Sequence, residues 1–135
     1  MKITCGIDII EIERIKDAIE PINNKLDDKF KERVYTEKEI TYCESKKQQK
    51  YQHYSARFSA KEAVFKAISQ YLGNKFEITW KDIEVTNDKT GRPKVTIYHE
   101  ISKKIEQIDI SMSHCKQYAI ANVVILWSDK TDINI

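Results

Sequence analysis

The sequence of 135 residues is poor in the residues that most often interrupt or crosslink a chain, with three glycines, two prolines and three cysteines. It has no internal repeat and no low-complexity segment, which excludes a repeat or linker protein. The cysteines stand at positions 5, 43 and 115, an odd number at wide spacing without a CxxC or Cys/His cluster. A disulfide framework or a zinc site is therefore not expected, and we interpret all three as reduced structural thiols.

Long apolar runs are also missing. No segment approaches the roughly 18 apolar residues that a membrane span requires. The chain passes from Lys2 straight into a short strand-like run, without a signal-peptide pattern. We therefore expect a cytosolic protein that contacts no membrane.

An excess of one charge is absent as well, because 23 basic residues oppose 21 acidic ones and leave a net charge of +2. This balance does not require a nucleic-acid partner, so any recognition of an anion has to be local. With 41% hydrophobic and 33% charged residues, the composition is that of a globular chain with a well-solvated surface. The length predicts one domain, residues 1–127, followed by a polar tail, residues 128–135.

A strand is followed directly by a helix at the start of the chain. Residues 3–9 alternate between apolar and other side chains, which predicts a short strand with Asp8 on the face opposite the isoleucines. Isoleucines then recur at helical spacing from Ile12 to Ile19, and Pro21 marks the end of this helix.

Helical periodicity continues into the middle of the chain. Apolar residues four apart predict a second helix within residues 26–34. Thr36 and Glu39 can form a capping box, which predicts the start of a short third helix. The longest predicted helix spans residues 53–72 and ends at Gly73-Asn74.

The second half of the chain changes to strand periodicity. Residues 83–85 and 95–98 predict a hairpin, and residues 99–105 predict a further helix. Two more strands are expected at residues 108–113 and 118–126. The last of these is the most hydrophobic stretch of the sequence and should lie in the interior of the sheet.

Acidic side chains at two places could bind a metal ion. Glu62 and Lys66 lie four apart on the longest helix and share a face, an arrangement that is more often an ordinary surface pair. Asp8 could equally be a strand-end or helix-capping acid. If the fold brings Asp8 and Glu62 together, they meet the minimum for Mg²⁺, which needs only one or two carboxylates when phosphate oxygens and water complete its shell.

Positive charge lies close to these acids in the sequence, in Arg57, Lys61 and Lys66, and could serve a polyphosphate. Lys61 falls in the middle of the apolar stripe, so we expect its methylenes to run along the surface and its ammonium to reach solvent. Two other features are ambiguous. Ser113-His114 contains a lone histidine of a kind that is more often structural, and the turn at residues 91–93 can simply shape a hairpin.

Five motifs, in their order along residues 3–125, resemble those of the holo-(acyl-carrier-protein) synthase family. They are Gly6-Ile7-Asp8-Ile9 with Arg14, Tyr35-Thr36-x-x-Glu39, Arg57-Phe58-Ser59-Ala60-Lys61-Glu62-Ala63 with Lys66-Ala67, Gly91-Arg92-Pro93, and Ser111-Met112-Ser113-His114. Each motif alone is weak, and the ordered set is specific. Two features depart from the family pattern: Tyr35 replaces the usual phenylalanine, and residues 70–75 contain one glycine where the family often has a glycine-rich segment.

The resemblance implies an α+β fold in a single domain, with a mostly antiparallel sheet packed against a long helix and shorter helices. It implies an enzyme that transfers 4′-phosphopantetheine from coenzyme A to a serine of apo acyl carrier protein and releases 3′,5′-ADP, in support of fatty-acid biosynthesis. Asp8, Glu62 and Lys66 would be its catalytic residues, with Asp8 and Glu62 as ligands of Mg²⁺ and Lys66 on phosphate. The base that accepts the serine proton stays open between Glu62 and a water molecule.

The resemblance also implies how the partners are bound. The residues implied to contact coenzyme A are Arg57, Lys61, Lys66, Gly91, Arg92, Pro93, Ser113 and His114. Arg14, Ile15 and Ala18 would receive the acidic carrier protein, and family members are typically homotrimers with sites between subunits. Two alternative functions are a non-catalytic coenzyme A or nucleotide-binding module and, ranked lower for lack of a recognition motif, a nucleic-acid adaptor. The natural acceptor, the tolerance for acylated coenzyme A and the choice of Mg²⁺ or Mn²⁺ stay open.

Overall fold

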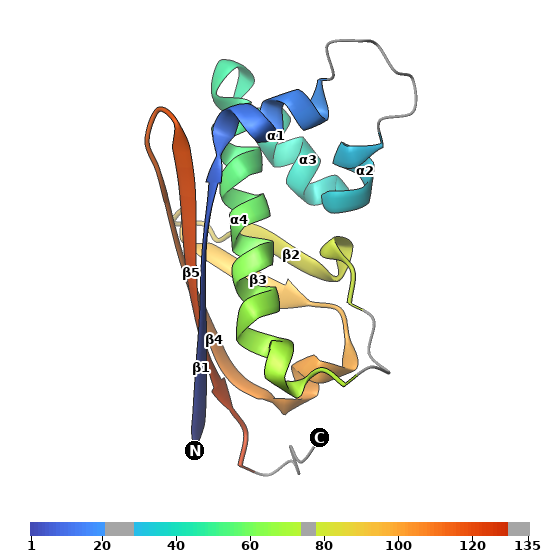
Figure 1. Ribbon diagram of the computed structural model, residues 1–135, viewed down its shortest axis with the longest axis vertical. Helices are drawn as coiled ribbons and strands as arrows, with labels where there is room; N and C mark the ends of the chain where they lie inside the picture. Colours follow the sequence, from blue (N-terminus) through green and yellow to red (C-terminus); the bar gives the residue numbers. More distant parts are fainter. Residues whose placement is uncertain (21–28, 74–77, 130–135) are drawn as a thin grey trace.

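The structure of the protein is a computed structural model that describes residues 1–20, 29–73 and 78–129. Two antiparallel sheets and one long helix form its framework (Figure 1). The larger sheet has the strand order β1-β5-β4, and the smaller one pairs β2 with β3. The strands are β1 (Lys2–Glu11), β2 (Ile83–Asn87), β3 (Pro93–Ile97), β4 (Ile105–His114) and β5 (Tyr118–Trp127). The α+β architecture expected from the sequence is therefore confirmed, with both sheets antiparallel.

The helices gather around the longest one, α4 (Lys50–Ile68), which lies along the larger sheet (Figure 1). The other α-helices are α1 (Ile12–Ile19), α2 (Phe30–Val34) and α3 (Glu37–Glu44). Short 3₁₀ turns span Lys47–Gln49, Ser69–Tyr71, Trp80–Asp82 and Glu100–Lys104. No helix in the described ranges is long and apolar enough to cross a membrane.

Most of the predicted elements are present with small shifts of their ends. The capping box forms, with the Thr36 hydroxyl accepting from the Glu39 amide and the Glu39 carboxylate accepting from the Thr36 amide. Helix α4 starts three residues before the predicted start at 53, and its predicted last turn is 3₁₀. Strand β5 is the central strand of its sheet, as expected. Leu26, Pro21 and residues 130–135 of the predicted tail lie outside the described residues.

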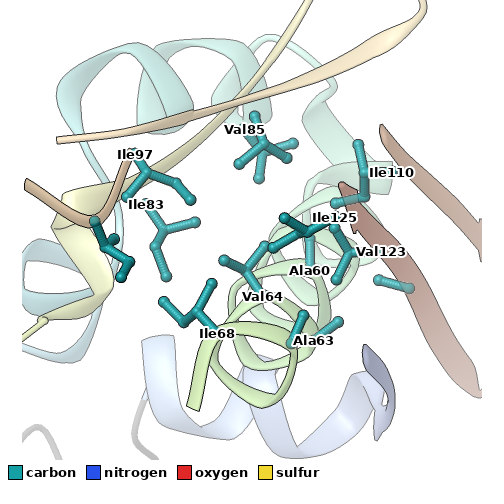
Figure 2. Close-up of a cluster of buried hydrophobic side chains, with 14 of the residues drawn as sticks. Ala60, Ala63, Val64, Ile68, Ile83, Val85, Ile97, Ile110, Val123 and Ile125 are labelled. Carbon is teal, nitrogen blue, oxygen red and sulfur yellow. The ribbon is translucent and has the colours of Figure 1, made fainter. Parts of the chain in front are cut away.

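Helix α4 is buried on almost every side, because it packs between the two sheets. Figure 2 shows side chains of α4 meeting side chains from β2, β3, β4 and β5 in one cluster. The labelled members are Ala60, Ala63, Val64, Ile68, Ile83, Val85, Ile97, Ile110, Val123 and Ile125. A helix that is enclosed in this way needs small residues where a backbone approaches it closely, and the alanines of α4 meet that need.

The closest approach is between β1 and α4, at Gly6. A Cβ atom on Gly6 would lie 1.9 Å from the backbone oxygen of Ala63, so no side chain fits at this position. The contact places the strand residue two positions before Asp8 against the helix residue next to Glu62. The missing side chain of Gly6 thus sets how near the two predicted metal ligands can come.

Three isoleucines of β1 lie on the face of the strand that points away from α4, whereas Ile10 packs on the core side. Ile3, Ile7 and Ile9 keep 63%, 54% and 60% of their surface exposed, while Gly6 is buried. On neighbouring β5, Tyr118 and Val124 are each 43% exposed. The outer face of the larger sheet, defined by these five large apolar residues, is therefore uncovered in the single chain, which is unusual for an isolated soluble domain.

Candidate functional site

Asp8 is presented by β1 toward α4. Its backbone oxygen accepts a hydrogen bond of 2.7 Å from the Ser59 hydroxyl on α4, which fixes the strand to the helix at this residue. Its carboxylate lies 3.3 Å from the ammonium of Lys66, and the side chain is 17% exposed. The sequence predicted Asp8 on the face opposite the isoleucines, and the strand has this orientation.

Glu62 and Lys66 lie one turn apart on α4 and both face Asp8. Burial, followed by repulsion from the Asp8 carboxylate, raises the pKa of Glu62, and Lys66 offsets part of this rise. Lys66 donates to the backbone oxygen of Ile7 at 2.8 Å and is 57% exposed, so its ammonium lies at the rim of the site. The fold thus brings together Asp8, Glu62 and Lys66, which the sequence singled out from positions more than fifty residues apart.

The pair of carboxylates fits a hard cation whose other ligands are phosphate oxygens and water. Two acids held close without a proton or cation between them repel each other, and this repulsion adds to the larger effect of burial in raising the pKa of Glu62. The described residues contain no group of three or more His, Cys, Asp or Glu side chains that could enclose a metal ion. The chemistry of the site therefore suits Mg²⁺, which keeps water and takes phosphate oxygens, better than a metal that requires an all-protein cage.

Lys61 lies on the opposite side of α4 and is fully buried. Its ammonium donates to a Glu39 carboxylate oxygen at 2.7 Å and to the backbone oxygens of Trp80 and Ile83 at 2.9 and 2.6 Å. Glu39 in turn accepts from the Val85 amide. The expectation that the Lys61 ammonium reaches solvent is wrong, because three protein oxygens satisfy it inside the core. With all three donors used, this lysine has none to offer coenzyme A, and its geometry favours a structural role.

A second group of predicted residues surrounds the N-terminal half of α4. Arg57 is only 1% exposed, and its Nη2 donates to the Asn87 side chain at 2.6 Å. Its guanidinium carbon lies 4.2 Å from the ring centroid of Tyr42. Its Nε is buried and has no hydrogen-bond partner among the described residues. An arginine with an unfilled donor indicates a place where an acceptor could bind.

Asn87 links Arg57 to the predicted Gly91-Arg92-Pro93 turn. Its amide nitrogen donates to the Gly91 backbone oxygen at 2.9 Å, and Gly91 has a positive φ of 87° that favours glycine. Hydrogen bonds from the Thr90 side chain, and from the backbone amides of Arg92 and Thr90, lower the pKa of the Asp88 carboxyl. The turn is therefore held in one shape, and Pro93 starts β3 directly after it.

Ser113 and His114 lie at the end of β4, and both are exposed. The His114 ring lies 6.1 Å, centroid to centroid, from the ring of His53 on α4. The structure therefore places the predicted histidine beside the helix that carries Arg57. It separates this group from the Asp8 and Glu62 group by about one turn of the same helix, because Arg57 precedes Glu62 by five residues.

The residues predicted to receive a carrier protein differ in how far the fold exposes them. Arg14 on α1 is exposed and Ala18 is half-buried. Ile15 is only 3% exposed and packs with Val34 and Tyr35 in a second hydrophobic cluster. The predicted contact by Ile15 is therefore wrong for the single chain, since this side chain anchors α1 to the core.

Sequence reasoning missed the polar residues that hold the site in place. Ser59, which fixes Asp8, and Asn87, which connects Arg57 to the Gly91 turn, were not singled out. His53 was also missed, although it lies four residues before Arg57 and therefore on the same helical face. Its position relative to Arg57 was the one signal that could have drawn attention to it.

Comparison with known proteins assigns this chain to a family. Residues 4–123 match the model of the 4′-phosphopantetheinyl transferase superfamily, and the chain belongs to that superfamily. A curated protein from Ruminiclostridium cellulolyticum, named holo-[acyl-carrier-protein] synthase, is 42% identical over 134 residues, which cover 96% of each chain. A protein of the same name from Chloroherpeton thalassium is 41% identical over 126 residues, covering 93% of this chain and 98% of that protein.

Solved structures agree with this assignment. The holo-(acyl-carrier-protein) synthase of Bacillus anthracis, solved in complex with CoA (3′,5′-ADP), superimposes with a TM-score of 0.73 at 35% identity, over 93% of this chain and 96% of that chain. The synthase of Helicobacter pylori, solved with coenzyme A, gives a TM-score of 0.73 at 29% identity, over 90% and 99% of the two chains. The family resemblance drawn from the ordered motifs is therefore confirmed.

Proposed function

We propose that the protein is a holo-[acyl-carrier-protein] synthase, which moves 4′-phosphopantetheine from coenzyme A to a serine of an apo acyl carrier protein. The observation that carries the proposal is the meeting of Asp8 and Glu62 across the β1–α4 contact, with Lys66 beside them. It is supported by relatives of that name that match nearly the whole chain. The product would serve fatty-acid biosynthesis, the pathway predicted from the resemblance.

In this reaction the serine oxygen forms a bond to the β-phosphorus of coenzyme A, and the bond from that phosphorus to the oxygen of the leaving 3′,5′-ADP breaks. Mg²⁺ held by Asp8 and Glu62 would supply charge stabilisation at the pyrophosphate. Lys66, already turned toward Asp8, would bind a phosphate oxygen and offset the growing negative charge. The serine proton passes to Glu62 or to a water molecule that Glu62 positions, and the raised pKa of Glu62 suits it to accept a proton.

The adenosine end of coenzyme A would bind near the N-terminal half of α4. The residues proposed for this end are Arg57, the Gly91-Arg92-Pro93 turn and Ser113-His114. The unpartnered Nε of Arg57 supports an anion there, and Asn87 holds the turn against Arg57. Lys61 is left out of the proposal because its ammonium is enclosed by Glu39 and two backbone oxygens.

A homotrimer with sites between subunits remains our proposal for the assembly. The outer face of the larger sheet supports it, because Ile7 and Ile9, on either side of Asp8, are more than half exposed in the single chain. The same face has a hollow of about 480 Å³ lined by residues such as Ile3, Val124 and Leu126, which a second copy could fill. Ile7→Glu should leave the fold of one chain intact and shift the mass in light scattering to that of a monomer.

The carrier protein would dock on α1 through Arg14, whose exposed guanidinium suits an acidic partner. Ile15 would act only by holding α1 in place, and Ala18 would lie at the edge of the contact. A cytosolic location, as expected from the sequence, is part of this proposal because coenzyme A and carrier protein would meet the enzyme there.

The test of the function is the intact mass of an apo acyl carrier protein after incubation with this protein, coenzyme A and Mg²⁺. A gain of one phosphopantetheine that disappears with EDTA and with Glu62→Ala would support both the reaction and the metal site. Binding of coenzyme A without any mass gain on several carrier proteins would instead support a non-catalytic binding module. Thr4→Ala, on the same face of β1 but away from the carboxylates, is the matched control and should stay active.

A further inference from the structure

His53 is a second imidazole beside the residues that the proposed function places at the adenosine end of coenzyme A. It precedes Arg57 by one turn of α4, and its ring centroid lies 6.1 Å from that of His114 on β4. On its other side the ring of Tyr42 from α3 packs nearly perpendicular to it, at 5.6 Å between centroids. The imidazole is half-buried and thus keeps an open side.

Basic side chains act on His53 from α4, from the residues just after α3 and from β4. Lys46, just after α3, has its ammonium 4.7 Å from the Tyr42 ring, and the Arg57 guanidinium lies 4.2 Å from the same ring. Burial, followed by the charges of Arg57, Lys46 and His114, lowers the pKa of His53 to about 4. No described carboxylate is among the groups that cause this shift. The cluster therefore combines an excess of positive charge with the unfilled Nε donor of Arg57.

A dianionic phosphate is the ligand that matches such a cluster, because it accepts several hydrogen bonds and reverses the local charge. We propose that His53 joins His114 in contacting the 3′-phosphate of coenzyme A, and that His53 takes up a proton from solvent as this phosphate binds. The inference rests on the proposed function, which places the 3′-phosphate end at Arg57 and His114. It adds to that function a residue and a proton step.

Proton uptake fixes the direction of the pH dependence. In the free protein the His53 ring is neutral at physiological pH, since its pKa lies near 4. A bound phosphate dianion favours the charged ring and so raises this pKa. Protonation of His53 then strengthens binding at pH values below the raised pKa, and this gain is lost as the pH rises through it. Dephospho-coenzyme A, which lacks the 3′-phosphate, should not show this dependence on His53.

The experiment uses nuclear magnetic resonance of the full-length protein labelled with ¹³C in its histidine rings. The sequence contains only three histidines, so each ring signal can be assigned by substitution. The protein is titrated from about pH 3 to pH 8, which covers both the lowered pKa of His53 and the usual range of histidine, without ligand and with coenzyme A, dephospho-coenzyme A or inorganic phosphate. We expect coenzyme A to raise the pKa of His53 by at least about one unit, equivalent to a tenfold effect on binding, and dephospho-coenzyme A to leave it unchanged. An equal shift with both forms of coenzyme A would overturn the assignment to the 3′-phosphate.

Steady-state kinetics of phosphopantetheine transfer provide a second, independent test. His53→Phe keeps a ring against Tyr42 but loses both nitrogens, and should raise KM for coenzyme A about tenfold at acid pH, with little change in kcat. His99→Asn is the matched control, because His99 lies outside the residues proposed for the adenosine end. Its Nδ1 accepts from the Ile101 amide at 3.0 Å, and asparagine can replace it as a cap. If the wild-type protein transfers phosphopantetheine but coenzyme A leaves the pKa of His53 unchanged, this inference fails and the proposed function stands. If no transfer occurs with any carrier protein, the proposed function fails first.

Discussion

Replacement of Gly6 by alanine tests whether the contact between β1 and α4 sets the geometry of the site. The new Cβ would lie 1.9 Å from the Ala63 backbone oxygen, whereas ordinary contact begins at 3.4 Å, so the strand and the helix must separate by 1.5 Å at this point. The obstructing atom belongs to the backbone and cannot rotate away. We therefore expect a loss of about 3 kcal/mol, the upper end of typical overpacking costs. This corresponds to a fall in melting temperature of about 12 °C for a chain of this size.

The activity should fall further than the stability alone explains. Asp8 follows Gly6 by two residues and Glu62 adjoins Ala63, so the same displacement separates the two proposed metal ligands. A misplacement of about 1 Å in a catalytic site can cost about 100-fold in rate, and we expect at least this loss in phosphopantetheine transfer measured well below the melting temperature. Addition of excess Mg²⁺ should recover part of the activity if the defect lies in metal affinity.

Two control variants separate the backbone clash at Gly6 from other effects of substitution in this region. Ala63→Gly removes only a side chain, so it should not rescue Gly6→Ala, because the clash is with the backbone oxygen of residue 63. Thr4→Ala lies on the same strand face and loses a hydrogen bond of 2.9 Å from the Trp127 indole, which should cost only about 1 kcal/mol and leave transfer intact. Full activity and an unchanged melting temperature in Gly6→Ala would refute the reasoning.

Three further variants address the core and the charges of the site. Lys61→Met should lower the free energy of unfolding in urea by about 3–5 kcal/mol, because Glu39 stays buried without its cation, and combining it with Glu39→Gln should restore part of the loss. A double variant no more stable than Lys61→Met would contradict this coupling. Burial and Asp8 raise the pKa of Glu62, so its charge destabilises the metal-free fold at neutral pH but not below the pKa of the unfolded chain. Glu62→Gln should therefore raise the melting temperature at neutral pH in EDTA, and this increase should disappear at about pH 4. The same variant should abolish transfer of phosphopantetheine. A lower melting temperature at neutral pH would count against it. Thr36→Ala removes a helix cap and should cost about 1 kcal/mol in the same urea titration, with Thr41→Ala on the same helix as the control.

Local patterns were sufficient to predict most of the fold. Alternation in β1, the Thr36–Glu39 capping box and the apolar run of β5 each depend on near neighbours in the chain, and each forms as expected. The order of motifs likewise identified Asp8, Glu62 and Lys66, because a family pattern records which distant residues meet. The spacing of these residues alone did not require them to come together.

The errors arose where long-range packing decides the outcome. Lys61 was expected to reach solvent, but Glu39 from another helix and the chain entering β2 enclose it, and neither contact is visible from helical periodicity. Ile15 was assigned to a partner surface although it faces Val34 and Tyr35. The exposed isoleucines of β1 show a further limit of local patterns, which do not reveal which face of a strand is buried. Their alternation marks an apolar face, and only the close approach at Gly6 determines that the opposite face packs on α4.

The pairing of β1 with β5 also has a consequence for synthesis. Lys2 pairs with Trp127 and Asp8 pairs with Ala121, so the first strand to leave the ribosome has its hydrogen-bonding partner at the far end of the chain. Until β5 emerges, β1 has no strand beside it among the described elements, and Asp8 lacks the support that directs it toward Glu62. A nascent chain that still lacks its last strand should therefore be unable to form the pair of carboxylates that we propose as ligands of Mg²⁺. Activity would begin only when the polypeptide is nearly finished.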